Sequence, residues 1–266
     1  MGIFNFSPEE VLTFVAVLIR FSTLVAVLPF TGDRMIPAPI KVLLSLAITL
    51  ALFPALVRTG AVRPGDAYQW GATTSSIVMT VGAEALFGLV LGFVGRLVFD
   101  AILLAGNLTG TFMGFAAASQ FDPHTEAQTQ TVAEIQMALA MLLFLALDGH
   151  HLMLHSVLGS YSIVGLGQAG VTGLLSQQLI EVTGNVIKFG LQLTAPVAIS
   201  IFAINVFFGV FSKAMPQVNI LILSFAITSF VGLVVMMVSM GEFGSVATEL
   251  FARMGDWFQN VIASMR

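Results

Sequence analysis

Several residue types that soluble domains use freely are scarce or missing in this sequence. The 266 residues include no cysteine, which excludes disulfides, thiolate metal sites, iron–sulfur clusters and cysteine nucleophiles. Charged residues make up only 9% of the chain, whereas they form roughly a quarter of an ordinary globular protein. With Lys and Arg together numbering 10 and a net charge of −4, the chain has no basic face for nucleic acid.

Apolar residues take the place of the missing charges. They make up 57% of the chain, the mean hydropathy is +0.98 and the aromatic residues are mostly phenylalanine. One compact core could not hide this much apolar surface, so the chain must contact lipid or be covered by partner chains. No polar linker divides the sequence, and we therefore predict a polytopic membrane protein of a single domain.

Long apolar runs predict six or seven helices, because a membrane helix needs about 20 predominantly apolar residues. Glycine and proline recur inside these runs, so we expect an all-α fold of kinked helices arranged as helical hairpins. The runs cover residues 11–28, 40–57, 71–99, 101–118, 131–147, 186–211 and 218–240.

The C-terminal segment 246–266 differs from these runs because it is amphipathic. Its apolar residues recur at steps of three and four, which places them on one helical face. Glu249, Arg253 and Asp256 fall on the other face. We expect a helix that either lies on a surface or partner, or packs over the end of the bundle.

The segment 106–123 combines flexible backbone with bulky side chains. Gly106, Gly110 and Gly114 each weaken a helix by about 1 kcal/mol relative to alanine, and Asp122-Pro123 ends it. The bulky uncharged residues among them are Phe112, Met113, Phe115 and Phe121. The segment is either a constriction beside a water-filled path, where irregular backbone is tolerated, or a glycine-rich packing helix.

Two charged residues interrupt apolar runs, Arg20 and Glu84. Charges at membrane depth are costly and are usually functional or paired. We favour an interhelical Arg20–Glu84 pair with a structural role over a role in ion transport. Gly88 and Gly92, one and two turns beyond Glu84, have the spacing that lets helices pack closely.

The sequence contains no convincing catalytic or metal-binding motif. His151 and His155 are spaced to share a helix face, but position 152 is Leu rather than the Glu of a metalloprotease helix. Asp148 and Gly149 are typical of a turn and helix start. Phosphate-loop, nucleophile-elbow and dinucleotide patterns are missing as well. We therefore expect a non-enzymatic protein without metal or cofactor.

A short polar segment separates the last two long apolar runs. Lys213, Pro216, Gln217 and Asn219 lie in it, and Pro216 could begin the second helix because it needs no amide hydrogen there. The segment is then the tip of a helical hairpin. It is either a plain turn or a tip that contacts the equivalent tips of partner hairpins.

Taken in order, these features resemble the FliR/SctT family of type III secretion export-gate proteins. The resemblance covers residues 8–260 and depends on the ordered set of motifs rather than on any one of them. The motifs are Arg20-Phe21 with Pro29, Pro37-Ala-Pro-Ile-Lys41, Leu52-Phe-Pro54, Glu84 with Gly88 and Gly92, Gln120-Phe-Asp-Pro123, Leu147-Asp-Gly-His-His151 and Pro216-Gln-Val-Asn219. Val218 and Leu166-Gly167 depart from the family pattern.

The resemblance implies a non-enzymatic core subunit of the flagellar export gate in the bacterial inner membrane. Such a subunit joins FliP and FliQ subunits in a helical assembly, partly raised toward the periplasm, that forms a conduit for unfolded exported proteins. FlhB and FlhA are the implied neighbours. Residues 1–175 would be FliP-like, 176–245 a FliQ-like hairpin and 246–266 the amphipathic helix.

The resemblance also implies that the family's plug falls within residues 106–123. We expect Phe112, Met113 and Phe115 to close the central path, and Gly110 and Gly114 to let the plug move. The alternative function is an autonomous small-solute channel or secondary transporter, which would carry a complete pathway within one chain.

Overall fold

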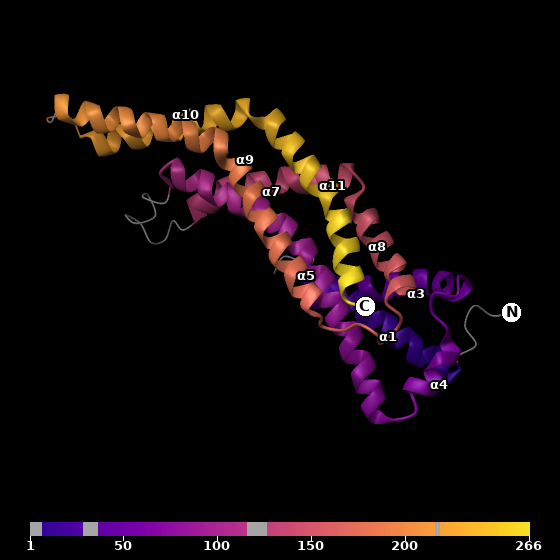
Figure 1. Cartoon of the computed structure of the whole chain (residues 1–266). Helices are drawn as coiled ribbons and strands as arrows, with labels where there is room; N and C mark the ends of the chain where they lie inside the picture. The colour runs from indigo at the N-terminus through magenta and orange to yellow at the C-terminus, as the bar shows by residue number, and fades with distance from the viewer. Residues whose placement is uncertain (1–6, 29–36, 116–126, 216, 218) are drawn as a thin grey trace. The chain divides into compact units, whose positions relative to one another are not determined.

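The computed structural model describes residues 7–28, 37–115, 127–215, 217 and 219–266, and every regular element in this part of the chain is a helix (Figure 1). The predicted all-α class is confirmed. The elements are α1 (Pro8–Val27), α3 (Ala38–Arg58), the 3-10 turn η1 (Pro64–Asp66), α4 (Ala67–Trp70), α5 (Thr74–Phe112), α7 (Ala127–Ala146), α8 (Gly149–Ile163), α9 (Gly173–Ala214), α10 (Ile220–Val238) and α11 (Met240–Ser264).

Four of the described helices are long and apolar enough to cross a membrane, namely α1, α3, α5 and α9. Two further pairs, α7 with α8 and α10 with α11, qualify when each pair is taken as one bent span. The polytopic membrane-type architecture predicted from the apolar runs is therefore confirmed.

Helix α5 is longer than the sequence indicated. The runs 71–99 and 101–118 belong to one helix of 39 residues that ends at Phe112. Gly106 does not interrupt it, because the missing side chain lets α5 lie directly against the backbone of Ala133 in α7. Close helix packing of this kind offsets the low helix propensity of glycine.

One compact unit of the chain comprises residues 1–97, 150–182 and 253–266. In it α1 packs against α3, with Phe14 and Phe53 in edge contact at 5.4 Å. Helix α1 also packs against α5, where Gly88 faces the Arg20 carbonyl and Gly92 faces Leu24. The helix-packing interpretation of these two glycines is confirmed.

The second compact unit comprises residues 98–149 and 183–252. Its core contains a cluster of three rings, Phe99, Phe144 and Phe251, whose centroids lie 5.1–5.6 Å apart. In this unit α10 runs beside the C-terminal part of α9, so the two helices form the predicted hairpin (Figure 1). The assignment of residues 1–175 and 176–245 to FliP-like and FliQ-like parts stays a prediction.

The amphipathic C-terminal helix is α11, and its apolar face is buried. Leu250, Met254, Phe258 and Val261 are all completely inaccessible to solvent. The C-terminal end of α11 is also tied down by Thr172, whose hydroxyl donates to the carbonyl of Ser264. Of the two predicted roles, the structure therefore supports the packing helix.

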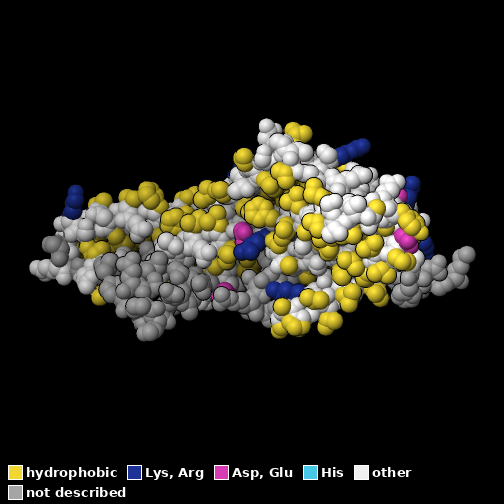
Figure 2. Space-filling model, turned by 90° about the horizontal axis from the view of Figure 1, so that it is seen from below, with side chains coloured by type: hydrophobic (Ala, Val, Ile, Leu, Met, Phe, Trp, Pro, Cys, Tyr) yellow, Lys and Arg dark blue, Asp and Glu magenta, His cyan; other side chains and the backbone are white. Residues whose placement is uncertain are grey.

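Much of the described surface outside this core is apolar. Figure 2 shows hydrophobic side chains spread across the visible face of the described residues, with only a few charged groups among them. Large apolar side chains on α9 and α10 are exposed in the described part of the chain, such as Phe202 at 70% and Met237 at 72%. Exposed apolar surface of this extent marks contact with lipid or with other proteins.

Candidate functional site

The two charges that interrupt the apolar runs form a buried ion pair. The Arg20 guanidinium on α1 donates from Nε to Glu84 Oε2 at 2.6 Å and from Nη2 to Oε1 at 2.9 Å. Both side chains are 0% exposed. The interhelical pair suggested by the sequence is therefore present, and its two-pronged geometry is the strong form of an arginine–carboxylate contact.

A third helix and a loop complete this site. Ser160 of α8 accepts a hydrogen bond of 2.9 Å from Arg20 Nη1, and the Gly167 amide donates to Glu84 Oε1 at 2.7 Å. The guanidinium also lies over the rings of Phe87, at 4.1 Å, and Tyr161, at 3.8 Å. Such cation–π contacts further compensate a charge removed from water.

Gly167 has a conformation that explains why glycine stands there. Its φ of +74° lies in the left-handed region, and an added Cβ would press against the Thr80 side chain. Only glycine adopts this region at little cost. The turn at Leu166-Gly167 thus brings the amide to Glu84.

A polar pocket opens beside this turn. Its lining includes the polar side chains of Thr13, Arg63, Asp66, Gln69, Thr80 and Gln168. The ion pair itself is enclosed, with every oxygen of Glu84 already accepting a hydrogen bond. This arrangement fits a clamp that joins α1, α5 and α8 rather than an exchangeable ion site.

The predicted plug residues lie at and beyond the end of α5. Gly110 is within the last turn of the helix, and Phe112 is 42% exposed. Gly114 has a φ of +92° and Phe115 is half-buried. Phe121 lies outside the described residues.

Met113 differs from its neighbours because it is completely buried. It packs in a cluster with Val132 of α7 and with Val197 and Ile201 of α9. Its carbonyl accepts hydrogen bonds from the hydroxyls of two α10 residues, Thr228 at 3.2 Å and Ser229 at 3.1 Å. Met113 therefore anchors the end of α5, unlike the exposed Phe112, although both were predicted to close the central path.

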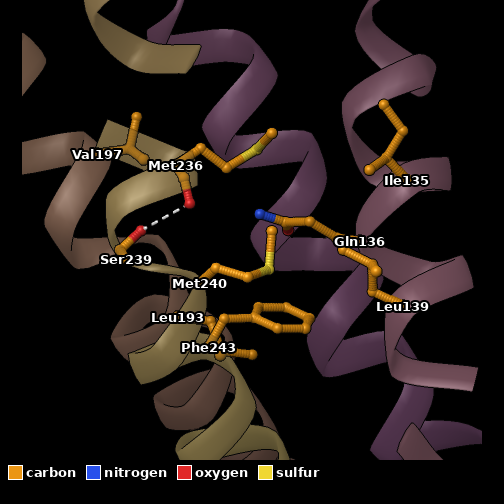
Figure 3. A pocket seen from close by; sticks show the side chains of 9 residues that line it. All are labelled: Ile135, Gln136, Leu139, Leu193, Val197, Met236, Ser239, Met240 and Phe243. Atoms are coloured by element: carbon orange, nitrogen blue, oxygen red, sulfur yellow. Dashed lines mark hydrogen bonds between the residues drawn. The ribbon is translucent and has the colours of Figure 1, made fainter. Parts of the chain in front are cut away.

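An apolar pocket lies where α10 meets α11, against α7 and α9 (Figure 3). The Gln136 side chain points into it toward Met236 and Met240 (Figure 3). Gln136 is 5% exposed, and its Oε1 accepts no hydrogen bond from the described residues. The remaining lining residues are Ile135, Leu139, Leu193, Val197, Ser239 and Phe243.

The predicted hairpin tip is partly described. Lys213 is in the last turn of α9, Gln217 is exposed in a turn, and Pro216 lies outside the described residues. The role of Pro216 at the start of the second helix therefore stays a prediction, and the described part of α10 begins at Ile220. Asn219 caps the helix there and accepts from the Ile222 amide, in keeping with the strong preference for asparagine at this position.

His150 and His151 lie at the beginning of α8 with their rings 4.1 Å apart, and His155 follows one turn later. Position 152 between His151 and His155 is leucine, so the helix lacks the glutamate that would serve as a general base. Asp148, His150 and His151 each offer one potential ligand atom, and these atoms lie within 4.8 Å of one another, so the three side chains could hold a metal ion. The metal-free expectation therefore stays a prediction at this position.

The fold and its sites define a class, a polytopic α-helical membrane-type protein whose buried polar groups hold helices together. The profile of the family described as "Bacterial export proteins, family 1" matches residues 11–254, and the chain belongs to that family. Its role is in flagellar protein export, which is not an enzymatic activity. The predicted FliR/SctT membership and the prediction of a non-enzymatic protein are confirmed.

Individual relatives match the chain from end to end. The chain is 23% identical to "Flagellar biosynthetic protein FliR" of Bacillus subtilis (strain 168) over 253 residues, with 94% of each chain covered. The protein of the same name from Escherichia coli (strain K12) is 24% identical over 248 residues, covering 93% of this chain and 92% of the relative. That of Pectobacterium carotovorum subsp. carotovorum is 27% identical over 252 residues, covering 93% and 91%.

Proposed function

We propose that the chain is a core subunit of the flagellar type III export gate, in which it joins FliP and FliQ subunits. The helical assembly forms the conduit for unfolded flagellar proteins. The observation that carries this proposal is the uncovered apolar surface of the α9–α10 hairpin in a member of an export family. A hairpin with apolar residues on its outer faces fits between similar hairpins or against lipid.

The division of labour follows the expected parts of the sequence. Residues 1–175 take the place of a FliP-like subunit and residues 176–245 that of a FliQ-like hairpin, so that one chain connects the two subunit types. Lys213, Pro216, Gln217 and Asn219 form the hairpin tip at subunit contacts. The long helices α3 and α9 support this view, since only 22% and 28% of their apolar windows are buried within the chain.

The gate is closed by the plug that begins at the end of α5. Phe112 is exposed there, and apolar side chains can seal a narrow path by excluding water. Gly114 provides a left-handed turn directly after the helix. Phe115 and Phe121 complete the plug, and Gly110 and Gly114 let it move when a substrate passes.

The assembly resides in the bacterial inner membrane within the flagellar basal body, partly raised toward the periplasm. FlhB surrounds its cytoplasmic entrance, and FlhA is a further neighbour of the gate. The chain holds the conduit together and does not itself supply energy. Export is driven by other parts of the apparatus.

Co-purification tests the subunit role. The affinity-tagged chain, expressed from its own locus and extracted in mild detergent, should bring down FliP- and FliQ-like subunits in fixed proportions. A variant that carries the same tag with Ile199, Phe202 and Val206 of α9 changed to serine should lose them. A chain that is stable, monomeric and active in solute transport by itself would instead support the small-solute transporter.

Ion leakage tests the plug. Deleting residues 112–121 should raise the leak of ions through the assembled gate, while FliP- and FliQ-like subunits still co-purify. Replacing Gly114 by alanine should also raise the leak, because alanine disfavours the φ of +92° observed at the start of the plug and so destabilises the closed arrangement. An assembled gate without residues 112–121 that leaks no more than the wild type would refute the plug.

A further inference from the structure

The end of α5 is held by two hydroxyl groups of the hairpin helix α10. The Met113 carbonyl lies directly beyond the last residue of α5, where helix carbonyls lack partners within their own helix. Thr228 Oγ1 and Ser229 Oγ both donate to this carbonyl, at 3.2 and 3.1 Å. In apolar surroundings such a carbonyl would otherwise be left without a hydrogen bond.

Apolar contacts reinforce the same junction. Gly232 lies one turn along α10 from Thr228, and a Cβ there would come within 2.6 Å of Met113 Cε and Cγ. Phe225, one turn in the other direction, faces Gly114 and makes an edge contact of 6.4 Å with the Phe115 ring. One face of α10 therefore receives residues 113–115.

The hydrogen bonds have a feature that suits a reversible contact. Thr228 Oγ1 also lies 3.1 Å from the carbonyl of Phe225 in its own helix, an alternative acceptor for its single hydrogen. When the end of α5 moves away, the Thr228 hydroxyl keeps a partner. The buried ion pair offers no such replacement, because removing either charged group leaves the other unpaired.

We propose that Thr228 and Ser229 are positioning residues for gate closure, which hold the end of α5 on the hairpin and thereby set where the plug begins. This inference rests on the proposed function, because it concerns the same gate. It adds that closure is controlled by α10, so that a shift of the hairpin releases Met113 and opens the path. The contact of Gly232 with Met113 sets the distance between the two helices.

The test removes the hydroxyls and retains the side-chain shapes. The double variant Thr228→Val with Ser229→Ala should keep its FliP- and FliQ-like subunits and leak ions faster. Loss of two hydrogen bonds of ordinary strength corresponds to a shift of roughly 10- to 30-fold toward the released state. The matched control is Ser245→Ala with Thr248→Val, whose exposed hydroxyls bond only to carbonyls of their own helix α11.

Each outcome of this comparison is decisive. An assembled double variant with an unchanged leak overturns the positioning role and leaves the proposed function intact. Loss of the partner subunits from the double variant alone overturns it too, since the hydroxyls would then be needed for assembly rather than for closure. Failure of the wild-type chain to bring down any partner counts against the proposed function itself.

A second experiment locks the junction instead of loosening it. The chain has no cysteine, so Phe115→Cys and Phe225→Cys introduce its only two thiols. A short bis-methanethiosulfonate cross-linker can join them through two reducible disulfides, with methanesulfinate as the leaving group. The linked complex should stop exporting and stay sealed, and a reductant should restore export to the level of the unlinked variant. Normal export by the fully linked complex would overturn the proposal.

Discussion

The Arg20–Glu84 pair leads to a prediction that separates a structural role from a role in transport. Glu84→Leu removes both carboxylate contacts and leaves a guanidinium that is 0% exposed, with Ser160 as its remaining hydrogen-bond partner. Breaking a buried pair in this way costs about 3–5 kcal/mol. That is between about a fifth and all of the roughly 5–15 kcal/mol that stabilises a typical domain, so we expect less folded protein.

The reverse change, Arg20→Met, should be about as damaging. It leaves the Glu84 carboxylate with the Gly167 amide as its remaining donor. The double variant removes both charges and fills the space with apolar groups. Since replacing a buried pair by apolar residues is often neutral or stabilising by about 1–4 kcal/mol, the double variant should recover most of the stability that each single variant loses.

The assay measures three quantities on the same cells. These are the amount of tagged chain in the membrane fraction, the thermal stability of the purified complex in detergent, and swimming motility. If the pair is structural, all three should fall in each single variant and recover together in the double variant. A double variant that is abundant, stable and assembled, yet non-motile, would refute the structural reasoning and assign the pair to export.

Four other positions give independent checks of the packing. Gly88→Ala should destabilise the chain by about 1–3 kcal/mol, because its Cβ would overlap the Arg20 carbonyl. Gly82→Ala, with open space around it, should stabilise the same helix by about 0.5–1 kcal/mol. Equal shifts of the melting temperature in the Gly88 and Gly82 variants would contradict this reasoning. Gln136→Leu should raise the melting temperature, because it removes a buried oxygen without a partner among the described residues. The expected gain is about 1–3 kcal/mol. A lower melting temperature would contradict this and would mean that another subunit donates to that oxygen. Thr172→Ala should cost about 0.5–2 kcal/mol as a lost helix cap and speed carboxypeptidase digestion of the C-terminus, which Thr172 tethers.

The helices and one of the sites could be predicted from the sequence because they depend on local pattern. Apolar runs of spanning length specify helices whatever their neighbours are, and the spacing in 246–265 specified the buried face of α11. Arg20 and Glu84 could be paired because charges inside apolar runs need partners. In each case a strong physical penalty acts on a few conspicuous residues.

The partners that complete these sites could not be predicted in the same way. Ser160 is 140 residues from Arg20, and the Gly167 amide is 83 residues from Glu84. A serine in a helix and a backbone amide in a loop carry no signal of their own. Only the tertiary fold brings them to the charged pair.

Met113 shows a second limit of sequence reasoning. It stands beside Phe112 in a run of bulky residues, but successive residues at a helix end point in different directions. Phe112 is therefore exposed whereas Met113 is buried. Thr228 and Ser229 could not be singled out from the sequence either, because isolated hydroxyl residues are common within apolar helices. The position at which α5 ends determines whether the Met113 carbonyl can accept hydrogen bonds from these two hydroxyls.

The Arg20–Glu84 contact and the contact of Met113 with Thr228 and Ser229 differ in how easily they can open, because the first joins buried charges and the second joins neutral groups. Partial separation of Arg20 and Glu84 is costly, because each buried charge would lose the attraction that offsets its removal from water. The bonds from Thr228 and Ser229 to Met113 are neutral, and Thr228 has a second acceptor within its own helix. A rigid frame calls for the first kind of contact, and a part that must yield to a passing chain calls for the second. The position of the neutral contact at the beginning of the proposed plug, rather than the position of the charged one, therefore indicates where movement starts.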